Sequence, residues 1–176
     1  IGFLGAVLTR LAAGAGARVV AVTRRPFALE VAGRMGAHEL VPLRDVASTR
    51  DVALARNGGQ PFDRVIEAVG LQEPLTLAGE LMRVRGRLVV AGYHQDGPRQ
   101  VDMQLWNWRG LDVVNAHERD PAVYVEGMRL AVEAVASGRL DPAPLYTHRF
   151  PLARLGDAFE AARTRPDGFL KALVTT

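Results

Sequence analysis

The sequence predicts an α/β protein with a doubly wound parallel sheet, in which helices cover both faces of the strands. Short continuous apolar runs, such as residues 19–22 and 88–90, alternate with longer stretches whose apolar residues recur at helical spacing. Strands that alternate with helices in this way are typical of a parallel sheet with helical crossover connections. The 176 residues suffice for one domain, or for one domain with an appendage.

Glycine and proline residues mark where the first predicted elements begin and end. Glycine after an apolar helical stripe favours a helix C-terminus, and proline favours the first turn of a helix. A short apolar run between two helices indicates a strand that is covered on both faces. We therefore expect a helix from Leu4 to Gly14-Ala15-Gly16, a strand at 19–22, a helix at 27–35, a weak strand at 38–42 and a helix at 45–56.

The same signals predict the rest of the chain. Asp120 and Pro121 are typical of a helix start, and Ser137-Gly138 of a helix end. We expect a strand at 62–69, a helix with the stripe Leu75, Ala78, Leu81 and Met82, a strand at 87–91, a strand at 111–115 after Trp106-Asn107-Trp108, a helix with the stripe Val125, Met128, Val132 and Val135, an extended connector at 141–144, a helix with Leu152, Leu155, Ala158, Phe159 and Ala162, and a closing strand at 169–174.

The segment Gly2-Phe3-Leu4-Gly5 opens the first helix. The dinucleotide-binding fingerprint G-x-G-x-x-G places three glycines between a strand and a helix. Gly2 and Gly5 fit its second and third glycines, where the backbone approaches a pyrophosphate at the helix N-terminus. The first glycine and its strand would lie upstream of Ile1, so we expect a Rossmann fold that lacks its first strand. Because two rows of backbone groups would lose partners, we expect these residues not to fold alone.

The end of the strand at 19–22 indicates which dinucleotide binds. Proteins that bind NAD usually place Asp or Glu here for the ribose hydroxyls, whereas this chain has Thr23, Arg24 and Arg25. A 2′-phosphate would meet a hydroxyl and at least one guanidinium in a charge-assisted contact. The sequence therefore predicts NADP, with NAD as the alternative if both arginines are ordinary surface charges. The missing acid also argues against S-adenosylmethionine.

Composition argues against several other classes of protein. The net charge is only +3, and the basic residues are scattered arginines apart from Lys171, so no nucleic-acid partner is expected. No apolar run reaches the roughly 18 residues that a membrane span needs. Cys is absent, which excludes thiolate metal sites and fits a reducing, cytoplasmic location. The histidines lack metal-ligand spacing, and His94 is the one we place near a substrate.

Several short segments follow one another along the chain in a specific order and spacing. The segments are Gly2 to Gly5, 22–25 (VTRR), 32–37 (AGRMGA), 63–70 (DRVIEAVG), 86–92 (GRLVVAG) and the tail from Thr147. Together they resemble the cofactor-binding half of the medium-chain, zinc-dependent alcohol-dehydrogenase-like family. The resemblance covers nearly the whole chain, and the tail is similar to the segment that returns to the family's catalytic domain. It implies an NAD(P)-binding domain at residues 1–116 and a return segment at 117–176 that packs on an absent catalytic domain.

The resemblance also implies roles for individual residues. Ala68 and Val69 would border the adenosine, the segment 91–93 would lie along the nicotinamide, and Lys171 would reach the pyrophosphate. Lys171 could equally be a solvated lysine at a strand edge. The residues expected to contact the cofactor are Gly2, Phe3, Leu4, Gly5, Thr23, Arg24, Arg25, Ala68, Val69, Ala91, Gly92, Tyr93, Asn115 and Lys171, with the backbone at Ala116 beside Asn115.

The family implies hydride transfer between NADP(H) and an alcohol or carbonyl substrate, with zinc only in the absent catalytic domain. This part of the enzyme alone is then expected to be inactive. The segment 106–115 resembles the family's subunit contact, which implies a homo-oligomer unless both tryptophans are buried within the monomer. Two alternatives stay open: a noncatalytic nucleotide-binding module, and a zinc-free relative of the quinone reductases. A short-chain dehydrogenase is excluded, because Asp167 stands where its Tyr-x-x-x-Lys pair needs tyrosine.

Overall fold

A computed structural model describes residues 1–176 and divides them into two compact units. The first unit comprises residues 1–40 and 125–176, and the second unit comprises residues 41–124. Helices and strands alternate through most of the chain, which confirms the predicted α/β class. The elements are α1 (Phe3–Gly14), β1 (Val20–Thr23), α2 (Pro26–Arg34), β2 (Glu39–Pro42), α3 (Val46–Arg56), β3 (Phe62–Glu67), α4 (Gln72–Leu81), β4 (Met82–Val90), α5 (Met103–Arg109), β5 (Asp112–Asn115), α6 (Pro121–Ala136), β6 (His148–Pro151), α7 (Leu155–Thr164) and β7 (Ala172–Thr175), with short 3-10 helices at Ala143–Leu145 and Leu152–Arg154.

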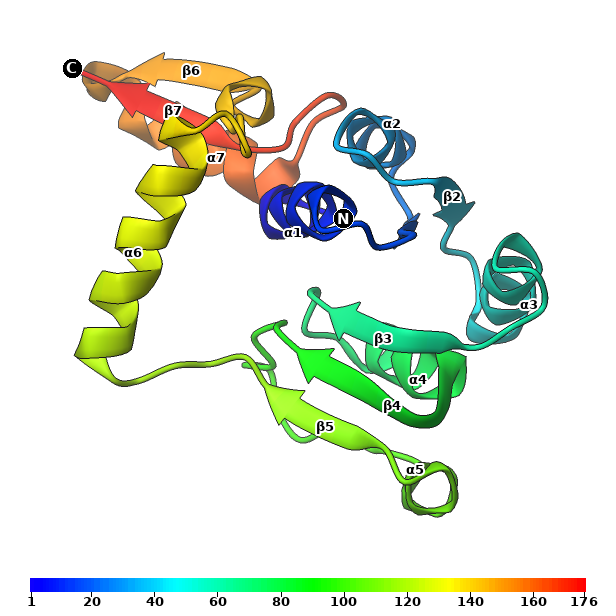
Figure 1. The fold of residues 1–176 in the computed structure, drawn as a ribbon. Coiled ribbons are helices and arrows are strands. Elements are labelled where there is room, and N and C mark those ends of the chain that lie inside the picture. The colour runs from blue at the N-terminus through cyan, green and yellow to red at the C-terminus, as the bar shows by residue number, and fades with distance from the viewer. The chain divides into compact units, whose positions relative to one another are not determined.

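The second unit is built on a parallel sheet of three strands in the order β3-β4-β5 (Figure 1). Leu88 of β4 pairs with Val65 of β3 on one side and Val113 of β5 on the other. Helix α4 packs against this sheet, and Leu75, Ala78, Met82 and Leu88 form a buried cluster. Because the strands are parallel, the carboxyl ends of β3, β4 and β5 meet at one edge of the sheet.

Strand β4 begins earlier than predicted and contains an irregularity. Phe62 of β3 pairs with Met82, but Arg64, two residues later, pairs with Arg87, so β4 carries extra residues between these pairs. Arg85 lies in this stretch with a φ of 55°, a conformation that few residues other than glycine adopt. The extra residues form a bulge, which bends the strand before its regular part.

The core of the first unit joins the beginning of the chain to its end. Ala6 of α1 and Val31 of α2 form one buried cluster with Leu145 and Leu170, which lie before and after the β6 and α7 region. Leu145 is fully buried. The tail thus packs on α1 and α2, while its packing on a catalytic domain and the boundary at residues 116/117 stay predictions.

The tail also contains a two-stranded parallel sheet. Strands β6 and β7 pair through His148 with Ala172 and Phe150 with Val174, and α7 lies against them (Figure 1). Strand β6 was not among the predicted elements, and neither was helix α5. The closing strand begins at Ala172 rather than at residue 169, because Phe169 and Leu170 turn into the core instead.

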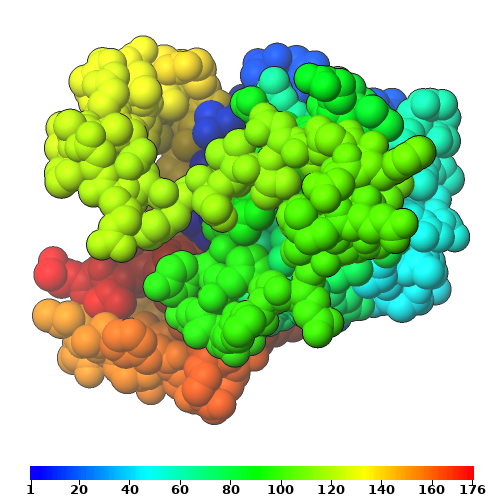
Figure 2. Space-filling view, turned by 90° about the horizontal axis from the view of Figure 1, so that it is seen from below, coloured from blue at the N-terminus to red at the C-terminus, as the bar shows by residue number.

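Several apolar side chains that the periodicity assigns to buried faces are exposed. On α6, Val125, Met128 and Val132 have exposed fractions of 68–69%, and Ala134 is the buried residue of this helix. All four residues of β5 are exposed as well, and the light-green atoms of α5 and β5 form part of the visible surface in Figure 2. None of the helices combines the length and the apolar character that crossing a bilayer requires.

Candidate functional site

The predicted phosphate loop lies at the start of α1. Gly2 is the N-cap residue, with extended backbone and a carbonyl that accepts from the Ala6 amide at 2.9 Å. No acidic side chain occupies the first turn, so the partial positive charge of the helix start is not neutralised there. A Cβ placed on Gly2 would meet no other atom within 4 Å. The loop therefore leaves room for an anionic group to approach the backbone.

Phe3 links this loop to Lys171. The Lys171 Nζ lies 5.4 Å from the centre of the Phe3 ring, within the range of a cation–π contact. The centre of the Tyr146 ring lies 5.8 Å from the centre of the Phe3 ring. Leu4 is exposed, whereas a Cβ on Gly5 would meet the Ile1 side chain at 3.3 Å. The structure thus brings Gly2, Phe3 and Lys171 together in the first unit.

The three residues after β1 differ in their surroundings. Thr23 ends the strand and is buried, with an exposed fraction of 8%, while Arg24 is exposed. Arg25 is half-buried, and its guanidinium donates a short hydrogen bond to the backbone carbonyl of Phe169. Arg24 is therefore the more exposed of the two arginines at the strand end, and Arg25 contacts the tail.

The predicted residues of the second unit lie at the carboxyl edge of the β3-β4-β5 sheet. The amides of Ala91 and Gly92 donate to the Glu67 carbonyl at 2.8 and 2.9 Å, which joins the turn after β4 to the end of β3. Val69 and Tyr93 are exposed, at 51% and 72%. The next strand ends at Asn115, which pairs with Val90, and the Ala116 amide donates to the Val90 carbonyl at 2.9 Å.

The turns after β3 and β4 are packed backbone against backbone. A Cβ on Gly92 would lie 2.2 Å from the Gly70 nitrogen, and a Cβ on Gly70 would lie 2.6 Å from the Tyr93 carbonyl oxygen. Gly70 also has a φ of +84°. These two glycines are what allows the two turns to touch.

A charged network that the sequence did not predict lies beneath these turns. The Glu67 side chain is 1% exposed, and its Oε2 lies 2.9 Å from the His94 Nε2. The other ring nitrogen, Nδ1, accepts from the Arg99 Nε at 2.9 Å. His94 is therefore not a free acid or base beside a substrate, because both ring nitrogens are engaged. The signal that could have found Glu67 is an acidic residue that directly follows the apolar residues Val65 and Ile66 at the end of a strand.

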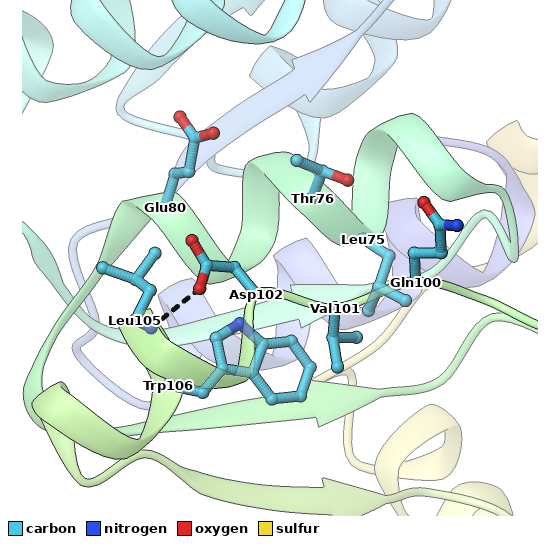
Figure 3. Close-up of a pocket in the computed structure, with 8 residues that line it drawn as sticks. All are labelled: Leu75, Thr76, Glu80, Gln100, Val101, Asp102, Leu105 and Trp106. Atoms are coloured by element: carbon cyan, nitrogen blue, oxygen red, sulfur yellow. Dashed lines mark hydrogen bonds between the residues drawn. The ribbon is translucent and has the colours of Figure 1, made fainter.

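A small hollow elsewhere in the second unit does not match the predicted site. It lies between α4 and the segment leading into α5, and Figure 3 shows the Trp106 ring beside it. Asp102 borders the hollow and caps α5 by accepting from the Leu105 amide at 2.9 Å. Its volume is about 40 Å³, far below the several hundred Å³ of typical ligand pockets. None of the predicted cofactor residues lines it.

The side chains of this chain do not fit a metal centre. No group of three or more His, Cys, Asp or Glu residues comes together. His38 Nδ1 accepts from the Val19 amide at 3.1 Å, and His148 Nδ1 lies 3.0 Å from the Thr147 hydroxyl. A zinc ion with several protein ligands therefore has no site among these residues.

Comparison with known proteins gives concordant results. The profile of a family described as zinc-binding dehydrogenase matches residues 4–133. A 2-dehydro-3-deoxy-L-galactonate 5-dehydrogenase from Pseudoalteromonas atlantica is 28% identical over 98% of this chain and 48% of its own length. The chain spans about half the length of the relatives that it matches.

Solved structures share the fold. A protein described as a short chain alcohol dehydrogenase from Escherichia coli, complexed with NADH, superposes with a TM-score of 0.81 at 19% identity, over 98% of this chain and 49% of that one. A mycobacterial protein complexed with NADPH superposes with a TM-score of 0.81 at 19% identity, over 99% of this chain and 54% of that one. These likenesses confirm the predicted Rossmann-type architecture.

Proposed function

Because the chain belongs to the zinc-binding dehydrogenase family, we propose that it is the NADP(H)-binding part of an oxidoreductase acting on an alcohol or carbonyl compound. One observation carries the choice of cofactor: the strand end at Thr23 is followed by an exposed arginine and by no carboxylate. An acid at this point would hold the ribose hydroxyls of NAD and would repel a 2′-phosphate. A hydroxyl and a guanidinium favour the phosphate.

The residues of the first unit would hold the phosphate groups. Gly2 and the amides of the first turn of α1 would receive the pyrophosphate, since the space before Gly2 is open and helix N-termini bind anions. Lys171, next to the Phe3 ring, would add a positive charge. Arg24 would pair with the 2′-phosphate, whereas Arg25 would act through its bond to the Phe169 carbonyl.

The residues of the second unit would border the rest of the cofactor. Ala68 and Val69 would lie along the adenosine, and Ala91, Gly92 and Tyr93 along the nicotinamide. Asn115 and Ala116, which end the neighbouring strand, would hold the carboxamide. This assignment is supported by the meeting of these residues at the carboxyl edge of a parallel sheet, where such folds bind ligands.

The cofactor would accept or donate the hydride, and this part of the protein would bind and orient it. No acid, base or metal ligand of the reaction lies among its residues in this proposal. We therefore expect residues 1–176 to be inactive without the remainder of the enzyme, in which a zinc ion would be held.

We also propose that the intact protein is a homo-oligomer. The two tryptophans of the segment 106–115 differ in exposure. Trp106 packs on the core of the second unit, while Trp108 is 87% exposed. An exposed tryptophan next to the exposed strand β5 is typical of a protein–protein interface. Light scattering of the full-length protein measures the oligomeric state directly.

The decisive experiment is calorimetric titration of the full-length protein with NADPH and with NADH at fixed salt. We expect tighter binding of NADPH. The Arg24→Gln variant should lose about 10- to 150-fold in affinity for NADPH, the loss of one charge-assisted contact, and little for NADH.

The matched control is Arg165→Gln, which removes another exposed arginine of the same unit. It should leave both affinities unchanged. Equal losses of affinity for NADPH and NADH in Arg24→Gln would leave the ratio of the two affinities unchanged. That outcome would show that the phosphate site lies elsewhere. Binding of neither dinucleotide by the wild-type protein would refute the proposed function.

A further inference from the structure

The geometry points to Glu67, His94 and Arg99 as a brace that positions the turn after β4 for the nicotinamide end of the cofactor. We name these three residues the brace. This inference rests on the proposed function, because it assigns a positioning role toward the same cofactor. None of the three touches the cofactor in this scheme; they act through Tyr93 and the backbone of the turn.

Glu67 holds the turn that follows its own strand. One carboxylate oxygen, Oε1, accepts from the amides of Val69 and Gly70 at 2.6 and 2.8 Å. These bonds are local and need no other side chain. The other oxygen, Oε2, is 2.9 Å from His94, which lies in the loop after β4. The carboxylate thus bridges the two turns at the carboxyl edge of the sheet.

Arg99 fixes the tautomer of His94. A guanidinium has only donors, so the His94 Nδ1 that receives the Arg99 Nε at 2.9 Å must be unprotonated. In the neutral imidazole the hydrogen then resides on Nε2, where it points to Glu67. Arg99 therefore donates to His94, and His94 donates to Glu67, so both ring nitrogens are hydrogen-bonded.

Arg99 also ties the loop to the opposite turn. Its Nη2 donates to the Gly70 carbonyl at 2.8 Å and to Asp96 in a short contact. The arginine side chain is 14% exposed and that of Asp96 is 60% exposed, so the bond to the Gly70 carbonyl is the better shielded of the two. Displacing the partly buried guanidinium would leave its donors without these partners. The loop from Tyr93 to Arg99 is accordingly held at both its ends.

The consequence concerns Tyr93, which projects into solvent from the braced turn. Removing His94 leaves the local bonds of Glu67 to Val69 and Gly70 in place, so the adenosine side keeps its shape. It removes the side-chain link from Glu67 to the loop after β4 and the acceptor of the Arg99 Nε, so the nicotinamide side is held less firmly. The brace therefore predicts that the two ends of the cofactor respond differently to the same substitution.

The test compares full-length wild type, His94→Ala and His94→Gln. Glutamine offers one amide donor and one carbonyl acceptor, as the neutral His94 does, but it cannot take up a proton. Each protein is titrated with NADPH and with 2′-phospho-ADP-ribose, which lacks the nicotinamide. We expect His94→Ala to lose on the order of tenfold in affinity for NADPH and less than about twofold for 2′-phospho-ADP-ribose. His94→Gln should recover most of the NADPH affinity.

A second readout needs no ligand. Hydrogen exchange of peptides covering residues 91–99 should be faster in His94→Ala than in the wild type, and near the wild-type rate in His94→Gln. Arg99→Ala should likewise speed the exchange of these peptides, and this exchange rate answers the same question if His94→Ala does not fold.

The outcomes separate this inference from the proposed function. Unchanged exchange in both alanine variants would overturn the brace, as would equal losses for NADPH and 2′-phospho-ADP-ribose. Failure of His94→Gln to restore NADPH binding would also overturn it, since one donor and one acceptor at this position would then not suffice. If the wild type binds neither ligand, the proposed function fails, and the exchange rates alone decide whether the brace holds the loop.

Discussion

Gly2 and Gly92 are both expected to lie against the cofactor, but they stand in different surroundings. A Cβ on Gly2 would meet nothing within 4 Å, and its backbone is extended, so alanine fits there. We expect Gly2→Ala to change the free energy of unfolding by less than about 0.5 kcal/mol. The methyl group would occupy the path of the pyrophosphate, so NADPH affinity should fall by about tenfold or more. Denaturant titration and calorimetry of the full-length variant check both parts.

Gly92→Ala is the contrasting variant for that prediction. Its Cβ would lie 2.2 Å from the Gly70 nitrogen and 2.5 Å from a Glu67 carboxylate oxygen, so the backbone must shift. A loss of roughly 1–3 kcal/mol in stability is expected from such overpacking. Normal NADPH binding by a stable Gly2→Ala protein would contradict the assignment of the phosphate loop.

At this scale the sequence predicts the residues whose role depends on local backbone geometry. Gly2 and Gly5 were identified because a helix start in a phosphate loop restricts the choice of residue, whereas Gly92 was assigned through the family resemblance. The sequence could not separate Arg24 from Arg25, because the partner of Arg25 is the Phe169 carbonyl, 144 residues away. Arg99 was missed for the same reason, since its role arises from contacts with His94 and Gly70.

At the scale of elements, helix α6 offers a stabilising substitution. Gly127 lies inside this 16-residue helix, and a Cβ there would meet nothing within 4 Å. Glycine in a helix interior costs roughly 0.5–1 kcal/mol relative to alanine, because it loses more backbone entropy on folding. We expect Gly127→Ala to raise the free energy of unfolding by about that amount, measured by chemical denaturation.

Helix α4 contains the matched control. A Cβ on Gly79 would lie 2.5 Å from the Trp106 Nε1, so Gly79→Ala should destabilise the protein although alanine favours the helix. Stabilisation by both substitutions would mean that α4 and Trp106 do not pack as described. Destabilisation by Gly127→Ala would mean that α6 is covered at this position in the full-length protein.

Periodicity predicted the long helices and most strands, but it gave the wrong boundaries where tertiary contacts decide. Helix α5 is only seven residues long, too short to show a stripe, and Asp102 starts it by capping the Leu105 amide. Strand β6 contains two charged or polar residues and a proline, and its partner is β7. Strand β4 begins at Met82 because Met82 pairs with Phe62 of β3 before the bulge. This pairing between strands has no signal in the local sequence.

At the scale of the molecule, the alternation of strands and helices was sufficient to predict the fold class. The packing of Leu145 and Leu170 on α1 and α2 was not predictable in the same way. Leu145 is the last residue of a short 3-10 helix and Leu170 follows a turn, and no periodicity marks a buried position in either segment. A contact between the two ends of a chain leaves no signal in a local pattern.

The pH dependence of stability is also a property of the whole molecule. Hydrogen bonds from Ser48 hold the pKa of Asp45 below its usual value, and backbone amides of Asp120 and Arg119 do so for Glu118. Hydrogen bonds from arginines lower the pKa of Asp96, Glu126 and Glu160. A carboxyl whose pKa is lower in the folded state stabilises the protein above its unfolded pKa, and this contribution is lost as the pH falls through the folded value.

All five carboxyls therefore act in the same direction, and we expect the melting temperature of the full-length protein to fall below about pH 4 and to be nearly level from about pH 5 to 7. Glu160→Gln isolates one of them, since it removes the partner of Arg163. The variant should melt below the wild type at pH 7, by a small amount because the pair is exposed, and the difference should shrink as the pH falls through the folded pKa of Glu160. Glu30→Gln, which removes an exposed carboxyl of the same unit outside this pair, is the control for the loss of one negative charge. A difference for Glu160→Gln that persists unchanged at pH 3 would show that the carboxylate acts by something other than its charge.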